Sequence, residues 1–143
     1  MTKFRRQIAG MTMTEVLVVM IVVAILAAFA IPSYREYTVR TQRTEAKTAL
    51  LQIATNQARF YLQNNTYSND LAELGFPGGQ SEKGLYTLAV PLANVNTFQV
   101  TAVPTVGGGV TGVDMNQDLE CIFFGVTAQG ARTAAPDPNS KCW

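Results

Sequence analysis

The side chains of this sequence that could carry chemistry are carboxylates and two cysteines. The chain contains no histidine, which removes the commonest general base of enzymes. We identify neither a nucleophile paired with a base nor a carboxylate dyad, so catalysis has no candidate residues. The stretch Gly107–Gly112 is interpreted as a loop, because it lacks the Lys-Ser/Thr of a phosphate-binding loop and opens no helix. The sequence predicts a protein that is not an enzyme and uses no cofactor.

The two cysteines, Cys121 and Cys142, both lie late in the chain. An even number of cysteines in an extracytoplasmic segment indicates a disulfide. This bond would close a loop of about 22 residues and stabilise the fold by about 3 kcal/mol on the chain-entropy model. Two buried free thiols are the alternative. No metal site is predicted, because zinc needs more ligands than two thiolates and the sequence has no histidine to add.

One carboxylate, Glu15, lies within an apolar segment. The sixteen residues Val16–Ile31 carry no polar side chain. With Met11 and Met13 in front, the segment has about 21 residues, or roughly 30 Å of helix, which matches one bilayer core. The leader Met1–Gly10 holds three cations and no anion, which places the N-terminus on the cytoplasmic side of a membrane. We therefore expect a single membrane-spanning helix.

The helix is expected to continue beyond the apolar segment. Pro32 removes one backbone hydrogen bond and should kink the helix rather than end it. Residues 35–63 contain neither Gly nor Pro, and their apolar positions recur at three- and four-residue steps. The polar side chains Arg43, Lys47 and Arg59 fall on the other side of this helix. We expect them to form a solvated face, or to line contacts with other subunits in an assembly.

The second half of the chain predicts a small sheet. Asn64-Asn65 should end the helix, and runs rich in Val, Thr and aromatic residues follow. The predicted strands are Leu85–Val90, Thr97–Val103 and Leu119–Thr127, with a candidate fourth at Ala131–Ala135. A helix ending near Leu62 would be on the order of 75 Å long, more than a chain of this size can bury. The fold class is therefore α+β, a long N-terminal helix whose hydrophobic half protrudes, packed on a small antiparallel sheet.

We divide the chain into a basic leader at 1–10, a hydrophobic transmembrane or filament-core helix at 11–34, and a globular head at 35–143. From Phe60 onward the head has three Lys or Arg residues against seven Asp or Glu residues. A net charge of about −4 is poorly suited to neutralising phosphates, which needs clustered cations. Nucleic acid is therefore not expected as a partner.

The N-terminal pattern resembles the class III signal of type IV pilins. The resemblance consists of the basic leader ending in Gly10, Glu15 at the fifth position after it, the apolar run and Ile31-Pro32-Ser33-Tyr34. In that family a prepilin peptidase cuts after the glycine, here Gly10, and methylates the new N-terminal amine, here on Met11. The head resembles minor pilins of the type IVa kind more weakly, through Gly75-Phe76 and Cys142-Trp143.

This resemblance implies a structural subunit of a type IV pilus, a minor pilin, that serves twitching motility, adhesion or DNA uptake in competence. The prepilin would span the bacterial inner membrane and then enter a cell-surface filament. Its partners would be other pilin subunits, the prepilin peptidase and the pilus assembly machinery. Glu15 would set the subunit register by pairing with the Met11 amine of a neighbouring copy, although a capping box with Thr12 also accounts for it.

Three alternatives are compatible with the sequence. A pseudopilin of a type II secretion system would share the anchor. A DNA-uptake receptor pilin would bind duplex DNA with its head, against which the acidic composition argues. An ordinary signal peptidase could cut at Ala28-Phe29-Ala30 and release a soluble head beginning near Ile31, although Glu15 is out of place in such a signal.

Overall fold

The computed structural model describes residues 11–106, 118, 120–136 and 142–143, with the backbone alone at 31–33 and 35–36. Its helix α1 (Met13–Asn64) has 52 residues. The helix begins where the sequence predicts, because the Glu15 amide donates to the Thr12 carbonyl at 3.1 Å and lies 3.3 Å from the Thr12 hydroxyl, as at an N-cap. It ends before Asn65, whose φ of 55° is the left-handed conformation of a C-cap.

By its internal packing the chain divides into two units, Met1–Tyr37 and Thr38–Trp143. Within the first unit, the window Met13–Ala30 has a mean hydropathy of 2.6, and 0% of it is buried by the rest of the chain. It is the one helical segment among the described residues that is long and apolar enough to cross a membrane. The helix continues through Pro32, as predicted; a kink there stays a prediction.

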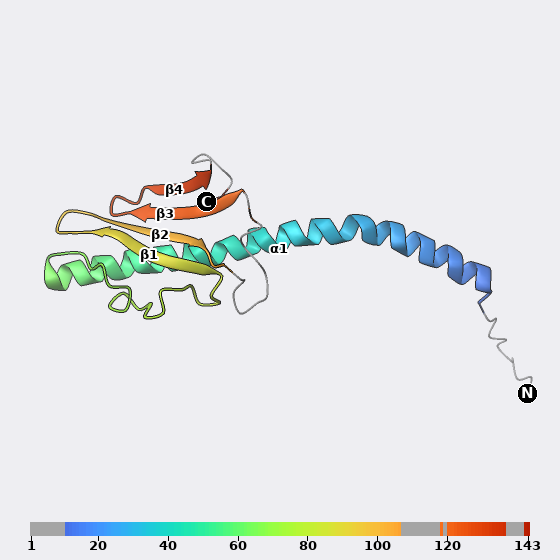
Figure 1. Ribbon diagram of the computed structural model, residues 1–143, viewed down its shortest axis with the longest axis horizontal. Coiled ribbons are helices and arrows are strands. Elements are labelled where there is room, and N and C mark those ends of the chain that lie inside the picture. The colour runs from blue at the N-terminus through green and yellow to red at the C-terminus, as the bar shows by residue number, and fades with distance from the viewer. Residues whose placement is uncertain (1–10, 107–117, 119, 137–141) are drawn as a thin grey trace, which may run out of the picture. The chain divides into compact units, whose positions relative to one another are not determined.

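The second unit contains a four-stranded antiparallel sheet in the order β1-β2-β3-β4 (Figure 1). Its strands are β1 (Tyr86–Ala93), β2 (Phe98–Pro104), β3 (Cys121–Thr127) and β4 (Arg132–Pro136). The predicted strands agree with these within a few residues. The exception is the end of β1, which continues past Pro91 with a register irregularity between Ala89 and Leu92. An edge strand tolerates this proline because its missing N–H is not needed on the open side.

The core of the second unit lies between α1 and the sheet. The helix contributes Ala46, Ala49, Leu50 and Ile53, a three- and four-residue spacing that puts them on one face. From the sheet come the buried residues Tyr86, Leu88, Phe98, Val100, Ala102, Phe124, Val126 and Ala134. Burying each large apolar side chain contributes about 1.5–3 kcal/mol. This packing holds α1 against the sheet within the second unit.

Candidate functional site

The start of α1 presents its apolar side chains to the surroundings. The large ones that are exposed include Met13, Val16, Leu17, Val18, Val19, Met20, Ile21, Val22, Val23, Ile25, Leu26 and Phe29. A contiguous apolar surface of this size marks a membrane or protein interaction site. Glu15 is the single charged side chain of the window Met13–Ala30 and is exposed. Met11 is 69% exposed, and Gly10 lies outside the described residues.

The two cysteines form the predicted disulfide, Cys121–Cys142. Both are buried, with exposed fractions of 1% and 0%. The bond joins the first residue of β3 to the segment that follows β4. Within the described part of the chain, no three His, Cys, Asp or Glu side chains lie together as metal ligands would.

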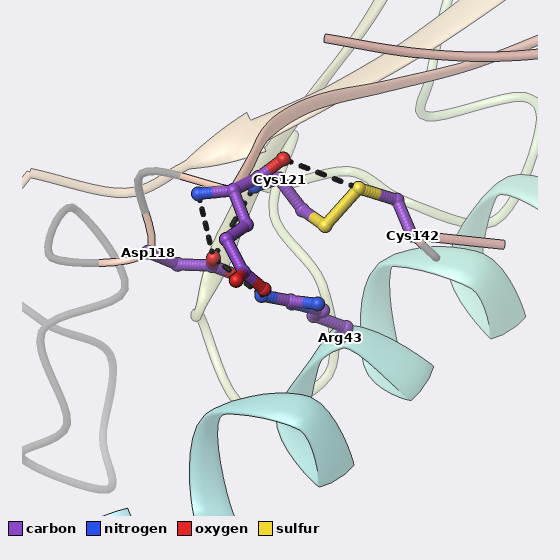
Figure 2. A network of polar contacts seen from close by, with 5 residues as sticks. Arg43, Asp118, Cys121 and Cys142 are labelled. Carbon is purple, nitrogen blue, oxygen red and sulfur yellow. Dashed lines mark hydrogen bonds and ion pairs between the residues drawn. A yellow bond between two sulfur atoms is a disulfide. The ribbon is translucent and has the colours of Figure 1, made fainter. Parts of the chain in front are cut away.

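Next to the disulfide lies a buried ion pair between α1 and the residues before β3 (Figure 2). Arg43 Nε and Nη2 donate to the two carboxylate oxygens of Asp118, each at 2.6 Å. Arg43 Nη2 also donates to Glu120 Oε2 at 3.0 Å. The Asp118 hydrogen bond raises the pKa of the Arg43 guanidinium against the opposing effect of burial. Asp118 also accepts from the backbone N–H groups of Glu120 and Cys121, each at 3.2 Å.

The expectation that Arg43 belongs to a solvated face of the helix is wrong. Its exposed fraction is 4%, and that of Asp118 is also 4%. Helical periodicity places Arg43 three residues before the core position Ala46, so it borders the buried face. No local signal could have identified its partner, which is 75 residues away in sequence. Arg59, by contrast, is exposed, as expected.

A second set of contacts surrounds Trp143 at β4. The Arg132 guanidinium stands 5.3 Å from the centre of the Trp143 ring, a cation–π distance. Trp143 Nε1 donates to the Thr133 carbonyl at 2.8 Å, and its ring meets Phe124 edge-on at 6.0 Å. Burial and the nearby charges of Arg43 and Arg132 lower the pKa of Lys47. Trp143 therefore packs against β3 and β4, with Arg132 over its ring.

The helix with an uncovered apolar start, the antiparallel sheet and the disulfide together define a type IV pilin. A model of the prokaryotic N-terminal methylation motif matches residues 5–31. A family model described as "Type IV minor pilin ComP, DNA uptake sequence receptor" matches residues 32–124, more than half of the chain. The chain therefore belongs to this family of type IV pilins.

Individual relatives agree with this assignment. The type IV major pilin PilA of Myxococcus xanthus is 27% identical over 96% of this chain and 59% of its own length. The type IV major pilin PilE of Neisseria gonorrhoeae is 33% identical over 59% of this chain and 51% of its own length. The chain thus spans about half to three fifths of the length of these two relatives. The crystal structure of the Neisseria meningitidis minor pilin PilV shares the fold, with a TM-score of 0.51 and 18% identity over 74% of this chain and 94% of that one.

The first prediction concerns the buried ion pair. Replacing Arg43 by Ala leaves the Asp118 carboxylate buried without its cation, so the free energy of unfolding should fall by about 3–5 kcal/mol. Urea unfolding of the full chain in detergent micelles measures this. The matched control, Arg59→Ala, removes an exposed cation from the same helix and should change stability by less than about 0.5 kcal/mol. Equal losses in the two variants would contradict the assigned role.

Proposed function

We propose that the chain is a minor pilin that is inserted into the inner membrane as a prepilin, cleaved after Gly10, methylated on Met11 and assembled through the start of α1. The proposal rests on one observation: the apolar helical window Met13–Ala30 is 0% buried. Lipid must cover such a surface before assembly, and neighbouring helices must cover it in the filament. The three cations and absent anions of Met1–Gly10 favour a cytoplasmic N-terminus.

In this proposal, Glu15 sets the offset between one copy of the protein and the next in the filament. A carboxylate near the end of a membrane helix can reach the headgroups, but toward the centre it costs about 2.5–3.5 kcal/mol. In a filament the cost is offset if a neighbouring copy offers a cation. Cleavage after Gly10 creates such a cation, the amine of Met11, two residues before α1 begins. Attraction between these opposite charges is strong at low dielectric, so an incoming copy stops at one fixed offset from the previous one.

Mass spectrometry of the protein purified from sheared filaments tests the processing. The expected chain begins at Met11, carries one methyl group on its N-terminal amine and lacks the two thiol hydrogens of Cys121 and Cys142. A chain beginning near Ile31 would instead show the secreted soluble domain. An uncleaved chain within filaments would contradict the proposed role of Gly10.

Replacing Glu15 by Ala tests the register role. Membrane insertion needs only the apolar helix, so the amount of the variant in the membrane should equal that of the wild type. The amount in sheared filaments should fall at least about tenfold, which corresponds to a loss of 1.4 kcal/mol in assembly free energy. Quantitative immunoblots of the two fractions measure this. The control, Glu82→Ala, removes an exposed carboxylate of the head and should leave incorporation unchanged. Wild-type incorporation of Glu15→Ala would refute the register role.

A second function is favoured by the family match. The matched family is described as a DNA uptake sequence receptor, and the match at residues 32–124 includes β1, β2 and most of β3. We propose on this basis that the head binds duplex DNA. The family model that matches residues 32–124 names a pilin, which favours a pilus over a secretion pseudopilus.

Gel-shift titration of the full chain in detergent micelles tests DNA binding. A duplex should be retarded at about 0.15 M salt, and the affinity should fall as salt rises because bound cations release counterions from the phosphates. No retardation at low salt would remove this second function and leave the pilus subunit.

A further inference from the structure

The second unit has a pocket of about 360 Å³ between α1 and the segment that precedes β1. The helix lines this pocket with Gln42, Glu45 and Ala49, which are three and four positions apart and therefore share one helix face. The segment before β1 contributes Phe76 and Glu82. A pocket of this volume is large enough for a small ligand. Neither of the proposed functions uses it.

Two oxygen atoms of this helix face lack a hydrogen-bond donor. Glu45 Oε1 accepts from the backbone N–H of Lys83 at 2.9 Å, whereas Glu45 Oε2 is buried and has no partner among the described residues. Gln42 Oε1 is also buried without a partner there. Leaving a buried acceptor without a donor is costly, and more so when it is charged. The terminal torsions of Glu and Gln are soft, so a ligand in the pocket that brings N–H groups can satisfy both oxygens.

The lining of the pocket favours a ligand of positive charge. Glu45 and Glu82 bring two carboxylates to it, against the single ammonium of Lys83. The ion pairs found between described residues both use Arg43, so Lys83 neutralises neither carboxylate there. Glu45 is partly buried, and salt screens the field of a partly buried charge less than that of an exposed one.

A guanidinium group meets these requirements together. It is always charged and carries five N–H donors in one plane, so it can donate to the Glu45 carboxylate and to the Gln42 amide oxygen at once. It is also weakly hydrated and stacks on aromatic rings, and the partly buried ring of Phe76 lines the same pocket. An ammonium group is more strongly hydrated and has no flat face to stack.

We propose that this pocket binds an alkyl guanidinium, with Glu45 as the counter-charge, Gln42 as a second acceptor and Phe76 beside the guanidinium plane. Two kinds of ligand carry this chemistry, namely a free guanidinium compound and an arginine side chain of another polypeptide. Ala49 adds apolar surface against which the alkyl chain of either ligand can pack.

NMR titration of the full chain in uncharged detergent micelles, at about 0.15 M salt, tests the proposal with N-acetyl-arginine amide as the probe. A probe of this size should bind with a Kd on the order of 1 mM. The backbone amide signal of Lys83, whose hydrogen bond ends on Glu45, should shift and saturate. N-acetyl-citrulline amide has nearly the same shape without the charge and should bind at least about tenfold more weakly. Equal affinity for the two probes would overturn the proposal.

Charge variants separate this site from the general attraction of an acidic head. Glu45→Gln removes the charge but keeps an oxygen that can accept from the Lys83 N–H, and it should weaken binding of the arginine probe at least about tenfold. The matched control, Asp70→Asn, removes an exposed carboxylate whose oxygen likewise accepts a backbone N–H, and it should leave the affinity unchanged. Lys83→Gln removes the competing cation and should tighten binding about threefold. Equal losses in Glu45→Gln and Asp70→Asn would overturn the assigned site.

Gln42→Leu gives an independent test, because it leaves the bond between Glu45 and Lys83 in place. It should weaken binding about fivefold, whereas Gln63→Leu, which removes an exposed amide of the same helix, should have no effect. Thermal melting reports whether each variant is folded. Agmatine and a blocked Gly-Arg-Gly peptide then distinguish the ligand sources. Binding of agmatine alone assigns a free compound, binding of the peptide assigns an arginine side chain, and binding of neither overturns the proposal.

Discussion

An apolar helix surface that the chain does not bury is the constraint on which this protein depends. The exposed side chains between Met13 and Phe29 would be unfavourable in water, at about 25 cal/mol for each Å² of apolar surface. Lipid chains and the side chains of neighbouring helices are similarly apolar, so the hydrophobic effect alone does not distinguish a membrane from a filament core. A charge in the segment can make that distinction. This is why a single carboxylate, Glu15, matters more here than it would on an ordinary surface.

The second unit has a small core, and further interactions restrain the chain around β3 and β4. A disulfide and a buried ion pair both act there. The disulfide joins the start of β3 to Cys142, and the bidentate contact of Arg43 with Asp118 fixes the residues before β3 to α1. A buried pair of this kind gives little net stability over apolar packing, but it is costly to break. The pair therefore makes one arrangement of helix and sheet strongly preferred.

Charge composition and charge placement lead to different expectations for the head. The excess of acids after Phe60 argues against DNA as a partner when the charges are treated as one sum. In the folded head, by contrast, two of these acids, Asp118 and Glu120, are paired with Arg43. Phosphate binding depends on such local potential rather than on the total charge.

Most of the fold could be predicted from the sequence by itself, because helices and strands are determined by local periodicity. The extent of α1, its two ends and the approximate strands follow from spacing and turn residues, and the disulfide follows from the even cysteine count. Only the tertiary structure decided that Arg43 is buried against Asp118. The two residues of this pair are 75 positions apart in sequence. Such contacts are set by how the helix packs on the sheet, and no short-range pattern records that packing.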